Sequence, residues 1–262
     1  MIINIESSSN SIFKNTKKLL TSSERRKTGR FIVEGYRIVA DAIRHKADID
    51  YIMVAAGYSQ ETYDDVCKVY RLSDKLFEEI SSTVNSQGII AVVNAPRPDA
   101  ESIFGGDCRY VVYLDSVMDP GNMGTILRTC DAMGVDAVVV SKGCVDIYNP
   151  KVVRSTMASI FNVPVYFERE DAVLSKLASR GYSIVGTFPD ESVSVYECDL
   201  TAKTVIVMGN EANGICDSVR ELCTHRVTVP MLGGAESLNV AVCCGMILYE
   251  QLRQRKNMKG DI

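Results

Sequence analysis

The sequence has no long apolar run, few histidines and no C-x-x-C pair, and each absence argues against a class of protein. No window of the 262 residues reaches the roughly eighteen consecutive apolar residues of a membrane span, so we expect no transmembrane helix. The first residues lack a basic region followed by an apolar core, so we expect no signal peptide. The nine cysteines form no C-x-x-C pair, and only His45 and His225 could join them as metal ligands. We therefore expect a cytoplasmic protein with reduced thiols, no membrane association and no bound metal.

The overall charge is not typical of a nucleic-acid-binding protein, but one segment is strongly basic. The formal net charge is −4, whereas nucleic-acid-binding domains are usually basic. Between residues 14 and 30, Glu24 is the only acid among seven basic residues, which are Lys14, Lys17, Lys18, Arg25, Arg26, Lys27 and Arg30. A solvent-exposed helix face would have the same composition. Charge alone therefore leaves RNA binding and a solvated surface as equal alternatives.

Apolar periodicity predicts two α/β regions separated by a linker. In the first region, helical patterns occur at residues 11–20, 36–44 and 74–81, and apolar strand patterns at 31–35, 49–55 and 89–93. Two prolines among small and polar residues then predict a linker over residues 96–106.

The second region alternates short apolar strands with helices. Strands are expected at residues 109–115, 137–141, 163–167, 183–187, 204–208 and 226–229, and the last helix at 236–253. Such alternation predicts a mainly parallel sheet covered by helices on both faces. We expect the polar tail, residues 257–262, to be frayed.

Three polar stretches follow strands of the second region, and parallel α/β sheets bind ligands where their strands end. The first is Asp119-Pro-Gly-Asn-Met-Gly-Thr-Ile-Leu-Arg128, in which Asn122 is predicted to cap a helix and Arg128 lies off its apolar stripe. The second, Met208-Gly-Asn-Glu-Ala-Asn-Gly-Ile215, has small residues that allow close approach of backbone to a ligand. The third, Pro230-Met-Leu-Gly-Gly-Ala-Glu-Ser-Leu-Asn239, leads into the last helix, whose first N–H groups can bind polar ligands.

In this order and at these spacings, the three stretches resemble the motifs of the SpoU (TrmH-type) RNA ribose methyltransferases. Asn122, Gly124 and Arg128 match the N-x-G-x-x-x-R pattern of the family, whereas Ala212 stands where many members carry glycine. The resemblance implies an α/β domain tied in a deep trefoil knot, S-adenosylmethionine as the cofactor, and a homodimer.

The same resemblance implies the site residues. Arg128, Asn122, Glu211, Ser237 and Asn239 would form the catalytic and substrate-facing group. Gly209, Val229 and Leu238 would contact the cofactor, largely through backbone, with Thr187 as a further position.

The first region carries a resemblance of its own. Arg26-Lys-Thr-Gly-Arg-Phe-Ile-Val-Glu-Gly35 and Val84-Asn-Ser-Gln-Gly-Ile-Ile-Ala-Val92 look like the L30e-like substrate-binding domain of many members. This implies an RNA-binding domain over residues 1–95 and a methyltransferase domain over 107–262. The basic segment would then contact phosphates around the target nucleotide.

We therefore expect transfer of a methyl group to a ribose 2′-hydroxyl in structured RNA, with ribosomal RNA favoured over transfer RNA. A non-catalytic RNA-binding or ribosome-assembly factor is an alternative, although such a protein would not need all five catalytic-type residues. The sequence lacks G-x-G-x-x-G, G-x-x-x-x-G-K-[ST], H-E-x-x-H and G-x-S-x-G, which argues against other enzyme classes. A guanidinium has a pKa above about 12, so orientation and electrostatic stabilisation are favoured for Arg128, with a base role left open.

Overall fold

The chain folds into two compact units. The computed structural model describes residues 2–61, 63–96, 98, 103, 108–168, 172–189 and 192–259, with side chains to residue 256. Unit 1 comprises Met1–Pro96 and Asp146–Phe161, and unit 2 comprises Arg97–Val145 and Asn162–Ile262. Most of the predicted linker 96–106 lies outside the described residues, so its boundaries stay a prediction. In the described part of the chain, no helix has the length and apolar character of a membrane span.

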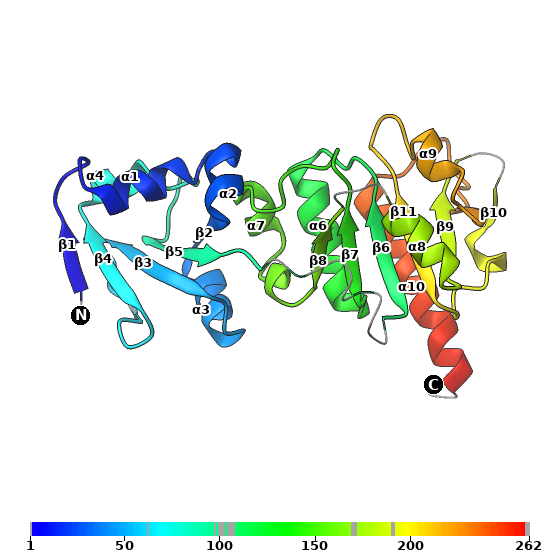
Figure 1. Cartoon of the computed structure of the whole chain (residues 1–262), viewed down its shortest axis with the longest axis horizontal. Coiled ribbons are helices and arrows are strands. Elements are labelled where there is room, and N and C mark those ends of the chain that lie inside the picture. Colours follow the sequence, from blue (N-terminus) through cyan, green and yellow to red (C-terminus); the bar gives the residue numbers. More distant parts are fainter. Residues whose placement is uncertain are drawn as a thin grey trace. The chain divides into compact units, whose positions relative to one another are not determined.

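Unit 1 contains a five-stranded mixed sheet (Figure 1), and an apolar cluster packs on each of its faces. The strand order is β1 (Ile2–Ile5), β4 (Lys68–Leu72), β3 (Ile49–Ala55), β5 (Ile89–Asn94) and β2 (Arg30–Glu34), with β5 antiparallel to both neighbours. Its helices are α1 (Ser11–Lys18), α2 (Ser22–Thr28), α3 (Tyr36–Arg44) and α4 (Asp74–Glu78). Alternate strand residues bury opposite faces: Ile32 and Met53 pack in one apolar cluster, and Val33 and Val54 in the other.

A later segment of the chain completes unit 1. It carries α7 (Pro150–Ser155) and the short 3₁₀ turn η1 (Ser159–Phe161). The ring of Phe31 in β2 lies 4.5 Å from that of Tyr148 and 6.5 Å from that of Phe161, measured between centroids. This segment lies inside the range predicted for the methyltransferase domain. Its return to the first sheet was not predicted, because periodicity reports which face is apolar and not which sheet it covers.

Unit 2 is a seven-stranded sheet in which every pair of neighbouring strands is parallel. The order is β10 (Val193–Ser194), β12 (His225–Thr228), β9 (Ser183–Thr187), β11 (Thr204–Met208), β6 (Tyr110–Leu114), β7 (Ala137–Val140) and β8 (Val165–Phe167). A mainly parallel α/β sheet in unit 2, together with a smaller N-terminal unit, confirms the predicted fold class.

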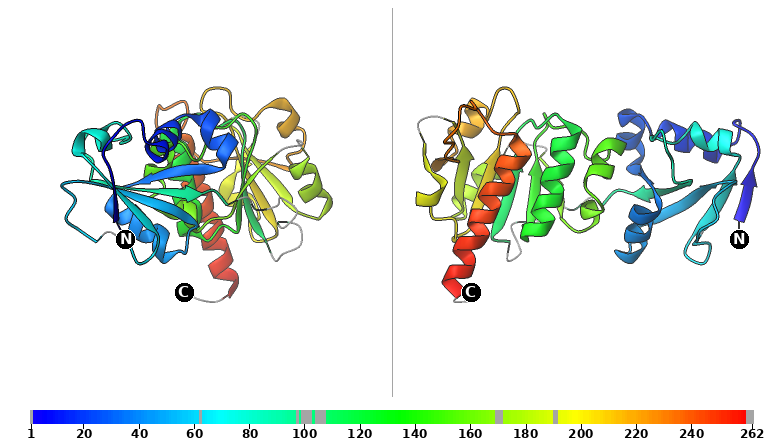
Figure 2. Two further views of the ribbon diagram at one scale, coloured as in Figure 1. Left: turned by 60° about the vertical axis from the view of Figure 1, so that its left-hand side comes forward. Right: turned by 180° about the vertical axis from the view of Figure 1, so that it is seen from behind.

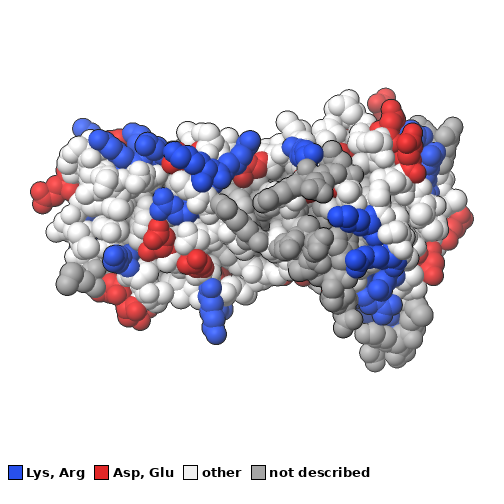
Figure 3. Space-filling model, in the orientation of Figure 1, with Lys and Arg blue, Asp and Glu red and all other residues white. Residues whose placement is uncertain are grey.

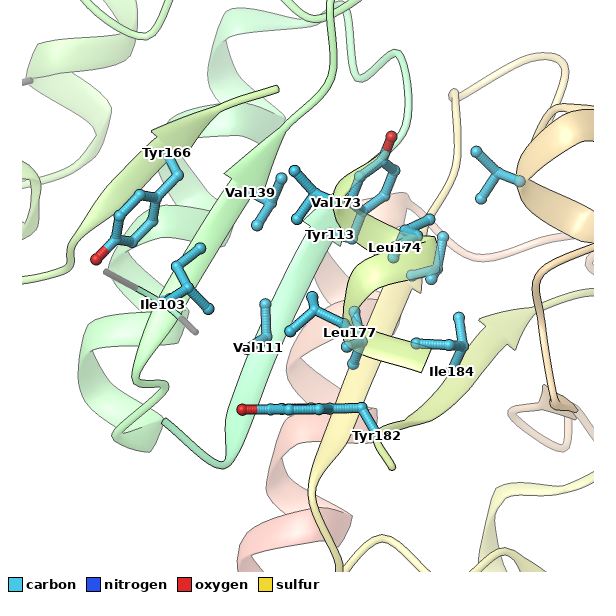
Figure 4. Close-up of a cluster of buried hydrophobic side chains, with 14 of the residues drawn as sticks. Ile103, Val111, Tyr113, Val139, Tyr166, Val173, Leu174, Leu177, Tyr182 and Ile184 are labelled. Atoms are coloured by element: carbon cyan, nitrogen blue, oxygen red, sulfur yellow. The ribbon is translucent and has the colours of Figure 1, made fainter. Parts of the chain in front are cut away.

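Helices cover both faces of the second sheet. On one face, α8 (Val173–Ser179) and α9 (Asp217–Arg220) cover an apolar cluster that includes Val111, Leu177 and Ile184 (Figure 4). On the other, α6 (Pro120–Met133) and α10 (Val240–Lys259) pack against each other, as the view from behind shows (Figure 2). A second 3₁₀ turn, η2 (Val195–Glu197), follows β10.

Several local predictions were wrong. The N-cap of α6 is Asp119, whose carboxylate accepts from the amide of Asn122, so Asn122 lies inside the helix and is not its cap. The last helix begins at Val240 and not at residue 236, because the preceding residues remain in the loop. Strands β1, β4 and β10 and helix α2 were not predicted, since they are short and polar residues interrupt their apolar pattern.

Candidate active site

The three predicted motifs meet at one edge of the unit 2 sheet. Strands β12, β9, β11 and β6 are consecutive neighbours and parallel, so their carboxyl ends lie side by side. Thr187 ends β9, Gly209 directly follows β11, and Val229 directly follows β12. The loop from Asp115 to Asp119 leaves β6 at the same edge. This is the position at which open α/β sheets bind ligands.

A chain of three side chains connects the motifs. Nδ2 of Asn122 donates to Oε1 of Glu211 over 3.0 Å, and Oδ1 of Asn122 accepts from Nδ2 of Asn239 over 2.9 Å. Oδ1 of Asn239 in turn accepts from the backbone amides of Ala241 and Val242, at 2.9 and 3.2 Å. Backbone amides can only donate and an ionised carboxylate can only accept, so both asparagine orientations are determined by their partners. The Asn122–Glu211–Asn239 network thus fixes one member of each motif relative to the others.

Glu211 is the acceptor at the end of this network. Besides Asn122, its carboxylate accepts from the backbone amides of Met118 and Asp119, at 3.1 and 3.0 Å. Partial burial acts to raise the pKa of Glu211, but the hydrogen bonds from Asn122, Asp119 and Met118 outweigh it and hold the pKa below its ordinary value. The site therefore contains a fixed negative charge at neutral pH.

The turn of the second motif requires its first glycine. Asn210 and Gly214 exchange backbone hydrogen bonds of 2.8 and 2.9 Å, which closes the turn. A Cβ atom at Gly209 would lie 2.3 Å from the carbonyl carbon of Gly214, so a larger residue would force this turn open. Gly214 itself has φ +68°, in the left-handed region that favours glycine.

Two polar residues tie the second motif to the first. Nδ2 of Asn210 donates to the carbonyl of Ser116 over 2.8 Å, and the buried carboxylate of Asp115 accepts from the amide of Cys216 over 2.7 Å. Asp115 was not among the predicted site residues. The only sequence signal was a carboxylate at the end of an otherwise apolar strand. Such a residue can equally be a solvent-exposed loop residue or, as here, a hydrogen-bond acceptor that joins two loops.

Four other predicted residues lie in these loops and strand ends without joining the network, and Arg128 lies further along α6. Ser237 is exposed, Leu238 and Val229 are half-buried, and Oγ1 of Thr187 donates to the carbonyl of Val207 over 3.2 Å. Arg128 is exposed on α6, six residues or about 9 Å along the helix axis from Asn122. Within the described part of the chain, Arg128 makes neither a hydrogen bond nor an ion pair.

The predicted RNA-binding residues divide into exposed and buried members. Lys14, Lys17 and Lys18 in α1 and Arg26 and Lys27 in α2 are exposed, and Figure 3 shows a row of basic side chains on unit 1 where these helices lie. Lys17 pairs with Glu79 at 2.6 Å, and the half-buried Arg30 pairs with Asp50 at 2.8 Å.

Arg25 differs from the others. It is 5% exposed, pairs with Asp146 at 2.7 Å and donates to the carbonyl of Leu19 over 2.8 Å. These bonds give Arg25 a structural role that its position in a basic run did not reveal.

No group of three or more potential metal ligands occurs among the described residues, and all nine cysteines are free. Burial raises the pKa of the Cys144 and Cys198 thiols, which keeps both protonated and unreactive at neutral pH.

Known proteins match both regions of the chain. Residues 109–249 match the SpoU rRNA Methylase family, and residues 10–91 match the MRM3-like substrate binding domain. The 23S rRNA (guanosine(2553)-2′-O)-methyltransferase RlmP of Bacillus subtilis is 33% identical, over 94% of this chain and 97% of its own length.

Solved structures agree over nearly the whole chain. An AdoMet-bound rRNA methyltransferase from Sinorhizobium meliloti is 26% identical with a TM-score of 0.87, covering 96% of this chain and 98% of that one. The SpoU methyltransferase AviRb from Streptomyces viridochromogenes, in complex with AdoMet, is 28% identical with a TM-score of 0.85, covering 94% and 98%. The chain therefore belongs to the SpoU rRNA methylase family and is a methyltransferase, as its three motifs predicted.

Proposed function

We propose that the protein transfers a methyl group from S-adenosylmethionine to a ribose 2′-oxygen in ribosomal RNA. The observation that carries this proposal is the Asn122–Glu211–Asn239 network, which joins all three motifs at the ligand-binding edge of the sheet. Relatives named as 23S rRNA 2′-O-methyltransferases support ribosomal RNA over transfer RNA. They also support an enzyme over a non-catalytic assembly factor, and a cytoplasmic location follows from such a substrate.

The residues at this edge fit the cofactor. Val229, Thr187 and Gly209, in that order, lie at the carboxyl ends of the three neighbouring strands β12, β9 and β11, and Leu238 lies in the third motif. Gly209 keeps the backbone of its turn tightly folded, which leaves amides and carbonyls rather than side chains to line the edge. Such backbone groups suit the adenosyl and amino-acid parts of S-adenosylmethionine. When bound, the cofactor supplies a sulfonium methyl group that a nucleophilic oxygen can displace.

The protein's own residues would bind and orient the ribose. An amide Nδ2 has two hydrogens, and among the described residues Asn122 and Asn239 each use one of them. The second hydrogen of each amide can donate to a ribose or phosphate oxygen. The fixed charge of Glu211 holds the Asn122 amide in this orientation, and Ser237 adds an exposed hydroxyl. Alignment of the 2′-oxygen with the methyl carbon is the largest contribution this arrangement offers.

Arg128 would bind the negatively charged RNA and stabilise charge that develops on the 2′-oxygen. A guanidinium keeps its proton in ordinary proteins, so electrostatic stabilisation is favoured over a base role. Its exposure, without a partner among the described residues, leaves it free to contact RNA or a second subunit.

We further propose a homodimer. Val242, Met246 and Tyr249 form an exposed apolar row on α10, with exposed fractions of 48%, 46% and 64%. The spacing of four and three residues places them on one face of the helix. A second copy of the chain would bury this row. Sedimentation of the Tyr249→Lys variant tests this, because a charge in the row should shift the protein towards monomer.

Within unit 1, the exposed residues Lys14, Lys17, Lys18, Arg26 and Lys27, with the partly exposed Arg30, would bind RNA phosphates. The match of residues 10–91 to a substrate-binding domain supports this role.

The activity is tested with tritiated S-adenosylmethionine, the purified protein and ribosomal RNA from a strain that lacks the gene. Label should enter one ribose, located by mapping 2′-O-methylation against RNA from the parent strain. Label in transfer RNA alone would support the transfer RNA alternative. Absence of label from both RNAs would contradict an enzymatic role.

A further inference from the structure

Unit 2 also carries cations at the edge of its sheet opposite the three motifs. Tyr110, Thr204 and Ser183 are the first residues of β6, β11 and β9, and they are partners in register. The preceding residues, Arg109 and Lys203, therefore lie at the amino ends of adjacent strands, about 5 Å apart in the pairing direction. Hydrogen bonds of 2.8 Å from Thr204 N to the Arg109 carbonyl and from Ser183 N to the Lys203 carbonyl extend this pairing.

Two tyrosine rings hold three cations at this edge. The guanidinium carbon of Arg255, from α10, lies 3.8 Å from the centroid of the buried Tyr110 ring, and that of Arg109 lies 5.9 Å from it. Nζ of Lys203 lies 5.5 Å from the centroid of the Tyr182 ring. We call Arg109, Lys203 and Arg255 the amino-edge cluster.

The rings themselves are fixed. The hydroxyl of Tyr110 donates to the carbonyl of Thr201 over 3.2 Å, and that of Tyr182 donates to the carbonyl of Cys108. A cation that lies against an aromatic ring can still donate hydrogen bonds to an anion, because its attraction to the ring does not use all of its N–H groups. The cluster is therefore pre-organised.

Acidic residues nearby are engaged elsewhere. Asp136 accepts from the backbone amides of Arg109 and Tyr110, at 2.7 and 2.9 Å, and Asp199 accepts from the amide and hydroxyl of Thr201, at 2.9 and 2.6 Å. Among the described residues, no carboxylate forms an ion pair with Arg109, Lys203 or Arg255. Figure 3 shows a group of basic side chains on one face of unit 2, with acidic side chains towards the margin of that face. Three cations without a carboxylate partner in the described part of the chain, in a protein of net charge −4, indicate a binding surface.

We propose that the amino-edge cluster is a second RNA-binding surface, which takes backbone phosphates of the RNA whose ribose occupies the motif edge. The five-residue strands β6 and β11 separate the two edges by about 17 Å, a distance that one RNA molecule can span. Phosphate is an anion that suits two guanidinium forks and a lysine at one sheet edge. Ribosomal RNA as the substrate is taken from the proposed function; the surface itself follows from the cluster.

The test compares two triple variants of the full-length protein with equal loss of charge. Arg109→Gln, Lys203→Gln and Arg255→Gln together remove the cluster. Lys46→Gln, Lys68→Gln and Lys75→Gln together remove three exposed lysines of unit 1 that lie outside its basic segment. The affinity for transcribed 23S rRNA is measured by filter binding over a range of salt concentrations.

The cluster variant should bind RNA at least about tenfold more weakly. Its plot of log affinity against log salt concentration should have a slope shallower by about 2, because each lost phosphate contact reduces the size of this slope by about 0.7–0.9. The control variant should keep the slope of the parent protein. Affinity for S-adenosylmethionine and turnover at saturating RNA should be unchanged in both, with KM for RNA raised only in the cluster variant.

An unchanged slope in the cluster variant, or an equal loss in the control variant, would overturn the proposal. If the triple variant does not fold, Lys203→Gln alone, at an exposed position, should still reduce the slope by about 0.7–0.9. Methyl transfer by the parent protein in the same samples reports separately on the proposed function. A parent protein that binds RNA through the cluster without methylating it would refute the activity and leave the surface standing.

Discussion

Nδ2 of Asn239 donates to Oδ1 of Asn122 over 2.9 Å, although 117 residues of chain separate the two. The same Asn239 caps α10 through its Oδ1, which accepts from the amides of Ala241 and Val242. One side chain thus begins the last helix and joins it to the first motif. These two roles can be separated by substitution.

Asn239→Ser should keep the helix cap and lose the bond to Asn122, because serine is a good N-cap but its side chain is too short to reach Asn122. We expect turnover to fall by at least about 10²-fold while the free energy of unfolding changes little. Asn239→Ala should lose turnover similarly and also destabilise the protein by about 1 kcal/mol. Urea unfolding and single-turnover methylation are the two measurements. Near-normal turnover in Asn239→Ser would show that the Asn122–Glu211–Asn239 network is not catalytic.

Arg128→Ala should retain affinity for S-adenosylmethionine within a few-fold, while turnover drops by at least about 10²-fold, as for loss of one transition-state contact. Arg128 lies on α6, away from the strand ends that would hold the cofactor. Arg128→Lys is the matched control: it keeps the charge but lacks the planar fork, so it should recover only part of the rate. Isothermal titration calorimetry measures the affinity for S-adenosylmethionine, and single-turnover kinetics measures the rate of methyl transfer. Equal rates for Arg128→Ala and the parent protein would remove Arg128 from the site.

The hydrogen bonds to Glu211 predict a pH dependence of stability. Because its pKa is held below the ordinary 4.5, the ionised carboxylate stabilises the fold above pH 4.5, and this contribution is lost as the pH falls through the lowered folded-state pKa. Glu211→Gln should therefore be less stable than the parent protein at about pH 7, with the difference shrinking as the pH falls below 4.5 and through the lowered folded-state pKa. Glu236→Gln, at an exposed position in the third motif, is the control and should show little difference at any pH. A difference for Glu211→Gln that is constant with pH would contradict the predicted role of its charge.

Arg25 and Arg26 are adjacent in sequence, but we expect their substitution to affect different properties, stability for Arg25 and RNA binding for Arg26. Arg25→Gln leaves Asp146 without its buried partner and should destabilise unit 1 by about 3 kcal/mol. Arg26→Gln removes an exposed charge and should weaken RNA binding while leaving stability within about 0.5 kcal/mol. Thermal unfolding and filter binding separate the two. Weaker RNA binding at full stability in Arg25→Gln would restore Arg25 to the RNA-binding surface.

Much of the fold could be predicted from local pattern, and the failures have physical reasons. The central strands β6, β7 and β11 of unit 2 are almost uniformly apolar and buried, so they were found within a few residues of their true ends, whereas the two-residue edge strand β10 was missed. The cap of α6 was misplaced because aspartate and asparagine are both good capping residues. Only the structure shows that the side chain of Asp119 accepts the hydrogen bond from a backbone amide of the first turn. The return of residues 146–161 to unit 1 depends on contacts such as Phe31 with Tyr148, far apart in sequence.

The site was predictable only through resemblance. Nothing in composition or periodicity brings Asn122, Glu211 and Asn239 together, since Asn122 lies in the first turn of α6 and the other two lie in separate loops, and these segments meet through the order of strands in the sheet. Asp115 and Asn210, which brace the loops, have no local signature that distinguishes them from ordinary turn residues. Arg25 could not be told from its basic neighbours, because burial is a property of the fold and not of charge.

The accepting atom is the central claim, and replacing the target nucleotide of the RNA with its 2′-deoxy analogue tests it most directly. Methyl transfer should be abolished while RNA binding barely weakens, because most affinity comes from phosphate contacts and shape that one hydroxyl hardly changes. A methyltransferase acting on a base would retain its nucleophile after this substitution. Radiolabelled methyl appearing on the deoxy-substituted RNA at a rate comparable to that of the natural RNA would contradict ribose 2′-O-methylation.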